Sequence, residues 1–380
     1  MTFSTLSEYL TFDDVLLLPG YSDFSRSDIS LTTKLTRTIS LSIPFVAAPM
    51  DTVCESKLAI ALGKLGGIGI IHRNLTIEEE ADEVANVKKA SLVAGAALPG
   101  NGNYQDRVSA LVRAGVDVIV VDSAHGNAKQ IVDAVQFIKK TYPKLSVIAG
   151  NVATGEGAER LIDAGVDGLR VGMGPGAICT TRVVSGMGVP QLTAIVETTK
   201  VALKTGIPVL ADGGIKYSGD MVKALAAGAS TVMMGSYFAS SEEAPGKLVE
   251  LTKEKVPLRF KSSLKIGKER YVFKEYRGMG SIAAMQQGVK IKSESEFHGK
   301  NYKDRVLVAE GVEGLVPVRG TVKELVDQAI GGIKSGMYYI GSKTIADLQK
   351  KARFIKITQA SLVESHPHDI LVTNGGGNYE

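Results

Sequence analysis

The chain has 380 residues, of which 44% are hydrophobic and 42 are glycine, so it can bury one large core or two modest ones. Its net charge of +4, with acids and bases interleaved outside a mildly basic C-terminal third, points to no nucleic-acid partner. Two cysteines offer no disulfide framework, no signal peptide is recognisable, and no apolar run reaches the length of a membrane span. We therefore expect a cytoplasmic protein that is not bound to a membrane.

Eight apolar segments alternate with helix-like segments along the chain. They lie within residues 44–50, 66–72, 92–98, 111–124, 146–153, 161–174, 208–214 and 224–236. Three of them are entered through Ala-Gly, which suits a helix C-terminus, and their continuous apolar runs suit strands covered on both faces. Helix-like stretches such as 77–89 and 219–228 lie between them. This order predicts an α/β fold, a (β/α)8 TIM barrel, rather than an open doubly wound sheet, which has fewer strands.

We expect a single catalytic barrel domain over residues 1–380. Residues 1–43 form an N-terminal lead-in and residues 360–380 a C-terminal segment in this interpretation. Residues 240–320 are too long for an ordinary connection and predict a long insertion after the eighth strand. Because barrel enzymes place their chemistry at the carboxyl ends of the strands, this insertion is expected to act as a lid or flap.

One cysteine lies in an unusual place. Cys179 belongs to the glycine-rich stretch VGMGPGAICTTR, residues 171–182, directly after the sixth apolar run. A glycine-rich loop lets the backbone approach a ligand and could present a nucleophilic thiolate, although an ordinary packed thiol is the alternative. Cys54 follows PMDTV at what looks like a helix start and is expected to be packed.

Two further loops suggest an anion site. The segments 211–220 and 234–241 follow the seventh and eighth strands, where barrels often bind phosphate. Unhindered backbone N–H groups are available there at Gly213, Gly214, Gly235 and Ser236. Tight turns that need glycine for their own geometry are the alternative.

The histidines indicate no metal cage. His72 and His125 end predicted strands and would either orient a ligand or cap their loops. His366 and His368 resemble zinc ligands in their spacing, but no second Cys/His pair at ligand spacing accompanies them.

A set of motifs occurs in order over nearly the whole chain. It includes LTFDDVLLLP, AAPMDTV, GGIGIIHRN, LRVGMGPGAICTTR, GVPQLTA, ADGGIKYSGD, YRGMGS, EGVEG and ESHPHD. This set resembles the inosine-5′-monophosphate (IMP) dehydrogenase / GMP reductase family. Within the family, GVPQLTA, YRGMGS and ESHPHD are similar to the dehydrogenase branch.

The resemblance implies a reaction and its catalytic residues. Cys179 would attack C2 of the hypoxanthine ring of IMP, the adduct would pass a hydride to NAD⁺, and hydrolysis would release XMP for guanine nucleotide biosynthesis. Thr181 and Glu310 match the residues that help to activate water.

The resemblance also implies three sets of binding residues. The nucleotide would be bound by Ala177, Asp212, Gly213, Gly214, Gly235, Ser236, Tyr276, Gly278, Met279 and Gly280. The nicotinamide side of NAD would lie near Asp122, Ser123, Asn151 and Arg170. A potassium ion would bind to the carbonyls of Gly174, Gly176 and Cys179, with Glu364, Ser365 and His366 contributed by a neighbouring subunit of a homotetramer.

The chain departs from the family pattern in three places. VKKASLVAGA joins the second and third strands directly, which leaves no room for the usual regulatory CBS domain pair. Ala177 replaces a serine that would contact phosphate. No Arg-Tyr pair follows YRGMGS, where an arginine normally activates water, and Lys292, Tyr302 or Arg305 are the possible substitutes. An Arg-Tyr pair at 270–271 lies on the wrong side of the motif, in the unusual extension 247–275.

Two other functions stay open. A GMP reductase, which deaminates GMP with NADPH, would need neither the flap arginine nor the CBS pair, whereas the YRGMGS and ESHPHD motifs favour the dehydrogenase. A non-catalytic nucleotide-binding homologue is the third possibility. The presence of Cys179, Thr181 and Glu310 argues against it.

Overall fold

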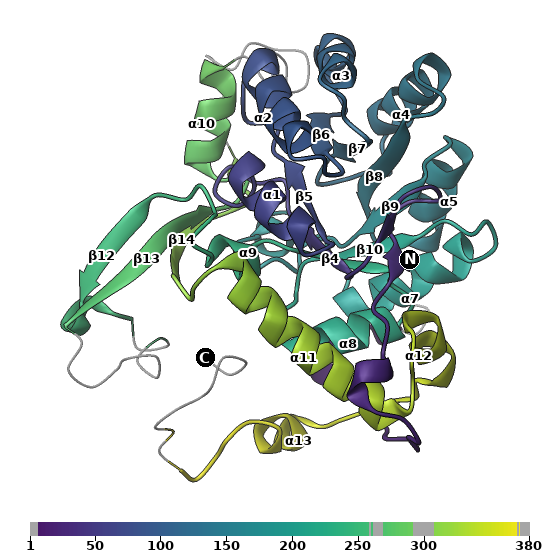
Figure 1. Cartoon of the computed structure of the whole chain (residues 1–380), viewed down its shortest axis with the longest axis vertical. Coiled ribbons are helices and arrows are strands. Elements are labelled where there is room, and N and C mark those ends of the chain that lie inside the picture. Colours follow the sequence, from purple (N-terminus) through teal and green to yellow (C-terminus); the bar gives the residue numbers. More distant parts are fainter. Residues whose placement is uncertain (1–6, 258–259, 261–268, 292–307, 371, 373–380) are drawn as a thin grey trace, which may run out of the picture.

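The computed structural model describes residues 7–257, 260, 269–291, 308–370 and 372. Eight parallel strands close into a barrel in chain order (Figure 1). They are β4 (Phe45–Ala47), β5 (Ile68–Ile71), β6 (Gly95–Pro99), β7 (Val118–Asp122), β8 (Ser146–Val152), β9 (Gly168–Val171), β10 (Val209–Asp212) and β11 (Thr231–Met234). The predicted (β/α)8 TIM barrel is therefore confirmed. Each of the eight apolar segments corresponds to one of its strands, and only β6 extends one residue beyond its segment, to Pro99.

A ring of helices covers the barrel (Figure 1). The helices that follow the eight strands are α1 (Ser56–Lys64), α2 (Ile77–Lys89), α3 (Tyr104–Arg113), α4 (Lys129–Thr141), α5 (Gly155–Asp163), α7 (Gln191–Ala202), α8 (Ser218–Ala226) and α11 (Val322–Ile340). Two single-turn helices, α6 (Thr181–Val184) and α9 (Ser236–Ala239), precede α7 and the final insertion.

The strands read as continuous apolar runs because both of their faces are buried. In β7, Val118 and Val120 pack in the interior of the barrel, while Ile119 and Val121 pack in the larger cluster that includes the helices. Side chains alternate along a strand, so a central barrel strand presents one set inward and the other outward, and both sets are apolar.

The Ala-Gly junctions end helices as expected. Gly115, Gly165 and Gly228 follow α3, α5 and α8 with φ values of +90°, +99° and +115°. Other residues rarely adopt this left-handed backbone, so glycine fits these helix ends and lets the chain turn directly into the next strand.

The N-terminal lead-in is part of the fold. The hairpin of β2 (Thr33–Lys34) and β3 (Ser40–Leu41) places Leu35 and Leu41 in the cluster that fills the barrel interior. Nearby, β1 (Val15–Leu17) pairs antiparallel with β15 (Phe354–Lys356), which joins the lead-in to the end of the chain. Two 3-10 turns, Phe12–Asp14 and Arg26–Asp28, and helices α12 (Ile345–Lys351) and α13 (Gln359–Glu364) complete this region.

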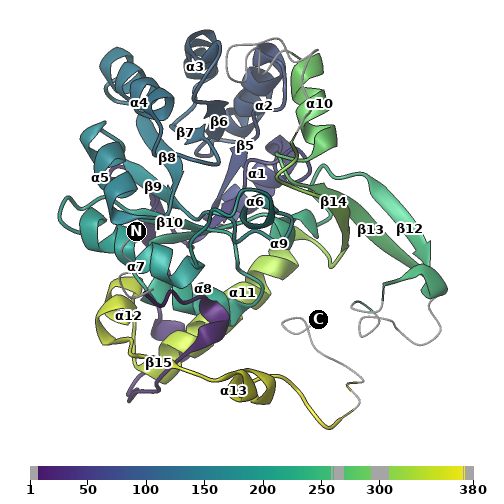
Figure 2. The ribbon, with the colours of Figure 1, turned by 180° about the vertical axis from the view of Figure 1, so that it is seen from behind.

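The insertion after the eighth strand carries its own sheet. The strands β12 (Leu248–Thr252), β13 (Arg270–Arg277) and β14 (Glu313–Pro317) form an antiparallel sheet that extends to one side of the barrel (Figure 1 and Figure 2). A 3-10 turn, Lys253–Lys255, follows β12, and α10 (Ile282–Lys290) follows β13. The Arg-Tyr pair at 270–271 is part of this sheet. Arg270 forms an ion pair with Glu250 at 3.0 Å, and Tyr271 is buried in the hydrophobic core of the sheet.

The second and third barrel strands are connected by α2 alone. This helix begins at Thr76, whose side chain accepts a hydrogen bond from the backbone N–H of Glu79, and ends at Lys89, shortly before β6 starts at Gly95. No further domain lies between β5 and β6. Among the described residues, no helix combines the length and apolar character needed to cross a membrane.

Candidate active site

The loop that carries Cys179 joins β9 to α6 and is paired with a distant part of the chain. The backbone N–H of Thr180 donates to the carbonyl of Glu310 at 2.9 Å, and Val312 donates to Ile178 at 2.9 Å. Cys179 also forms an isolated β-bridge with Gly311. The EGVEG segment of the insertion is therefore attached along the cysteine loop. Figure 2 shows α6 near the middle of the view, with β14 and α10 to one side.

Three side chains form a hydrogen-bonded row at this junction. The thiol of Cys179 donates to Oγ1 of Thr181 at 3.2 Å, and that hydroxyl donates to Oε2 of Glu310 at 2.9 Å. All three residues are half-buried. The threonine hydroxyl can accept a proton on one side and pass one to the carboxylate on the other, so the row connects a nucleophile to a proton acceptor.

Arg182 holds the two ends of the cysteine loop together. Its guanidinium donates to the carbonyl of Met173 at 3.2 and 3.3 Å and to that of Val189 at 2.6 Å. A Cβ at Gly174 or Gly188 would lie 2.6 or 2.5 Å from the Arg182 side chain. Both glycines therefore leave room for the Arg182 side chain, which explains part of the glycine content of the loop.

Four charged residues and an asparagine form a network across the carboxyl ends of the strands. Asp122, at the end of β7, accepts hydrogen bonds from Arg170 and, at 3.1 Å, from Arg73. Arg170 also donates to Oδ2 of Asp212 at 2.9 Å, and the side chain of Asn151 donates to the same oxygen at 2.8 Å. The structure thus joins Asp212, expected at the ribose, to the residues expected near the nicotinamide.

The network keeps its members charged. Burial alone would raise the pKa of Asp122, but the positive charges of Arg170 and Arg73 outweigh burial and hold the pKa below its ordinary value. Burial would likewise lower the pKa of Arg170, and Asp212 and Asp122 raise it instead. Removing one member of such a buried pair typically costs about 3–5 kcal/mol, because it leaves an uncompensated buried charge.

Three glycines in the two loops expected to bind phosphate occupy positions that suit no other residue. Gly213 and Gly214 have φ values of +90° and +78°, which few other residues adopt. A Cβ at Gly235 would lie 2.6 Å from the hydroxyl of Tyr276, and that hydroxyl is hydrogen-bonded to the backbone of Ser236. Burial, and then the charge of Asp212, raise the pKa of Tyr276 above its ordinary value, so the phenol stays protonated.

The YRGMGS segment is attached to the barrel by residues that the sequence analysis did not select. Arg277 forms a two-pronged ion pair with Asp51, with contacts of 2.6 and 3.1 Å. Asn74 donates to the same carboxylate at 2.7 Å and to the carbonyl of Ala284 at 3.3 Å. Asp51 and Asn74 lie in the loops after the first two strands, and that position was the signal that could have identified them. Beyond Arg277, the backbone N–H of Gly278 donates to Val312, and that of Glu310 donates to Gly280. The Gly278–Met279–Gly280 turn therefore lies against EGVEG.

Other expected residues have simpler surroundings. Ala177 is exposed in the cysteine loop, and Ser123 donates its backbone N–H to Gly150 at 3.0 Å. His72 is buried, contacts Glu55 at 3.3 Å and accepts a hydrogen bond from the backbone of Asn74, so it caps its loop. Cys54 is fully buried, as expected, and its pKa is raised by burial and then by Glu55 and Glu83.

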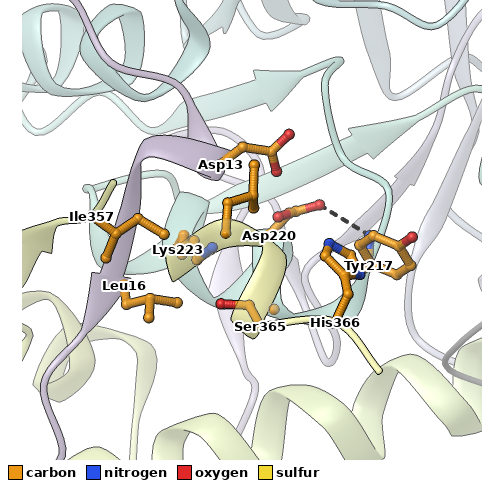
Figure 3. A pocket seen from close by; sticks show the side chains of 10 residues that line it. Asp13, Leu16, Tyr217, Asp220, Lys223, Ile357, Ser365 and His366 are labelled. Atoms are coloured by element: carbon orange, nitrogen blue, oxygen red, sulfur yellow. Dashed lines mark hydrogen bonds between the residues drawn. The ribbon is translucent and has the colours of Figure 1, made fainter. Parts of the chain in front are cut away.

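Two of the three residues expected to complete a potassium site, Ser365 and His366, lie near the N-terminal region and the start of α8. Ser365 and His366 line a pocket of about 230 Å³ with Asp13 and with Tyr217 and Asp220 at the start of α8 (Figure 3). The lining of this pocket includes none of the cysteine loop. In the described part of the chain, no group of three or more His, Cys, Asp or Glu side chains could hold a metal ion. Lys292, Tyr302 and Arg305 fall outside the described residues.

Comparisons with known proteins show what the whole chain is similar to. The family described as "IMP dehydrogenase / GMP reductase domain" matches residues 9–368. An inosine-5′-monophosphate dehydrogenase of Borreliella burgdorferi is 41% identical over 413 residues, covering 96% of this chain and 97% of the relative. The enzyme of that name from Cryptosporidium parvum is 40% identical over 422 residues and covers 100% of both chains.

A third relative differs in length. The inosine-5′-monophosphate dehydrogenase of Aquifex aeolicus is 37% identical over 502 residues, covering 98% of both proteins. This alignment is longer than the 380 residues of the present chain. The Aquifex protein therefore carries residues with no counterpart here.

Proposed function

Because the chain belongs to the IMP dehydrogenase / GMP reductase family, we propose that it oxidises IMP to XMP with NAD⁺ as the hydride acceptor. This is an oxidation step of guanine nucleotide biosynthesis. The observation that carries the proposal is the row of Cys179, Thr181 and Glu310, because covalent oxidation followed by hydrolysis requires a nucleophile and a proton acceptor at one place.

The row accounts for both halves of the reaction. The Cys179 thiolate forms a C–S bond to C2 of the purine, and the hydrogen at C2 leaves as a hydride. NAD⁺ supplies the site that accepts these two electrons. Water then adds to C2, its proton passes through the Thr181 hydroxyl to Glu310, and the C–S bond breaks to release XMP and the thiolate.

The charged network orients the rest of the substrate. Arg170 and Asn151 both bind Oδ2 of Asp212, so they fix its carboxylate from one side and direct it toward the ribose hydroxyls. Gly214, Gly235, Ser236 and Tyr276 hold the phosphate, and the Gly278–Met279–Gly280 turn contacts the base. Asp122 and Ser123, on the other side of Arg170, face the nicotinamide.

The direction of the reaction can be tested in one assay. The protein is mixed with IMP and NAD⁺, and separately with GMP and NADPH, and the absorbance of the reduced nicotinamide is followed. The proposal requires absorbance to rise in the first mixture. A fall in the second mixture with no change in the first would identify a GMP reductase, and no change in either would identify a non-catalytic nucleotide-binding protein.

Potassium is expected to accelerate turnover. The carbonyls of Gly174, Gly176 and Cys179 are hard oxygen donors of the kind that this ion prefers, and a left-handed backbone at Gly174, with φ of +78°, makes that turn possible. We propose that Glu364, Ser365 and His366 of an adjacent subunit complete the site in a homotetramer. Replacing potassium by a large organic cation, or removing the residues after Val363, should then slow turnover in the same assay. Equal rates with and without potassium would contradict this site.

ATP and GTP are not expected to change the rate of turnover by binding at a separate regulatory site. A regulatory domain typically needs on the order of 100 residues, and α2 alone connects β5 to β6. The measurement is the initial rate at saturating IMP and NAD⁺ over a titration of each nucleotide. A saturable change that persists at saturating substrate would show that a regulatory site exists elsewhere.

A further inference from the structure

β13 buries one of its faces before Lys274 and the opposite face from Lys274 onward. Tyr271 and Phe273 pack with Val256 in the core of the insertion sheet, whereas Tyr276 packs in the main cluster of the barrel. Because side chains alternate along a strand, Lys274 lies on the same face as Tyr276. Its side chain is only 3% exposed. A charged residue is therefore buried where the insertion meets the barrel.

Within the described part of the chain, the hydrogen bonds of the Lys274 ammonium group all go to backbone carbonyls. Its Nζ donates to Ser241 at 2.7 Å, to Glu242 at 3.0 Å and to Ala244 at 2.6 Å. An ammonium has three N–H donors, so each finds an acceptor. Burial, and then the charge of Lys57, lower the pKa of Lys274, while Glu243 and Glu242 act in the opposite direction. The three carbonyls replace the water that a buried ammonium loses, and they fix the backbone path of residues 241–244.

That backbone path sets the position of α9. The 241–244 turn follows the C-terminal end of α9, and the backbone N–H of Glu242 also donates to Gly320 at 2.8 Å. At the other end of α9, the hydroxyl of Tyr276 is hydrogen-bonded to the backbone of Ser236. Lys274 and Tyr276, which lie two residues apart on one face of β13, therefore hold the two ends of α9. This short helix begins in the loop that is expected to bind phosphate.

We propose that Lys274 is a positioning residue for the phosphate end of the substrate site. It holds the turn after α9 so that Gly235 and Ser236 meet Tyr276 in the geometry that binds a 5′-phosphate. The assignment rests on the proposed function, since it concerns the same nucleotide site. Lys274 does not touch the reacting atoms and acts only through the backbone that it binds.

The test compares Lys274→Met with wild-type protein. Met fills a similar volume but cannot donate to the three carbonyls. The measured quantity is the concentration of IMP, or of GMP, that halves the rate at which iodoacetamide alkylates Cys179. We expect this concentration to rise roughly tenfold, because a misplaced charge-assisted contact costs about that much affinity. The KM for IMP should rise in parallel, with kcat at saturating IMP little changed.

Three controls separate positioning from a general loss of structure. Lys247→Met removes the same charge from an exposed position near the base of the sheet and should leave IMP protection unchanged. Inosine, which lacks the phosphate, should protect Cys179 equally in Lys274→Met and wild type. The rate of alkylation without ligand should also be equal in the two proteins.

The outcomes are distinguishable. Unchanged IMP protection in Lys274→Met, or an equal loss of IMP and inosine protection, would overturn the role of Lys274. If Lys274→Met fails to fold, as judged by thermal melting, Lys274→Gln takes its place under the same criteria, since an amide keeps some of the donors. Wild-type protein that neither IMP nor GMP protects would overturn the proposed function itself, and the role of Lys274 with it.

Discussion

Cys179→Ala is expected to lower the rate of NADH formation from IMP by more than about a thousandfold. The methyl group of alanine cannot form the C–S bond, and catalytic groups that act as a unit lose nearly all of their effect when the nucleophile is removed. IMP should still bind with an affinity close to that of the wild type. The ribose and phosphate contacts proposed at Asp212, Gly214 and Ser236 lie outside the Cys179 loop and do not depend on its sulfur. Stopped-flow absorbance gives the rate, and equilibrium dialysis with labelled IMP gives the affinity.

The second cysteine supplies the matched control. Cys54 is fully buried between α1 and β5, where a Cβ on Gly69 would lie 2.6 Å from its sulfur. Cys54→Ala removes a packed atom and should cost about 1 kcal/mol of stability while leaving turnover nearly unchanged. Substantial turnover in Cys179→Ala would exclude the covalent mechanism. A large loss of turnover in a folded Cys54→Ala variant would show that the effect is not specific to the loop thiol.

The barrel could be predicted because its signals are local. A run such as Val118–Asp122 shows a strand buried on both faces, and a glycine such as Gly115 shows where the preceding helix must end. Eight such runs that alternate with helix-like segments then define a closed barrel, and the glycine loops after its strands indicate the active face.

The contacts that organise the site could not be predicted from local patterns. Arg73 and Asp122 are 49 positions apart, and Thr181 and Glu310 are 129 positions apart, so neither pair has a characteristic spacing. Only the family motifs related Glu310 to Cys179. Lys274 shows the same limit: in the run YVFKEY a lysine at an alternate position is typical of a solvent-facing strand residue, and nothing local indicates three backbone carbonyls around its ammonium.

Glu310→Gln is expected to separate the two halves of the reaction. The hydride step needs only the Cys179 thiolate and a bound NAD⁺, whereas hydrolysis needs a group that takes the proton of water. The Thr181 hydroxyl donates to Glu310 at 2.9 Å, and an amide cannot accept the proton that this hydroxyl passes on. General acid–base catalysis typically contributes about 10²- to 10⁴-fold, so steady-state turnover should fall by a factor in that range. Rapid mixing should still give a burst of NADH close to one per active site.

The size of the loss in Glu310→Gln then identifies the water-activating group. No Arg-Tyr pair follows YRGMGS, so the proton must leave through Thr181 and Glu310 unless Lys292, Tyr302 or Arg305 takes over. We propose that hydrolysis already limits the wild-type rate. The wild type should then show a burst of NADH as well, and Glu310→Gln should increase the ratio of the burst rate to the steady-state rate. Glu275→Gln, which removes a carboxylate from an exposed position on β13, should leave both phases unchanged. A Glu310→Gln variant with wild-type turnover would assign water activation to the 292–305 segment. A variant that loses the burst together with turnover would instead place Glu310 in the formation of the Cys179 adduct, as the acceptor of the thiol proton through Thr181.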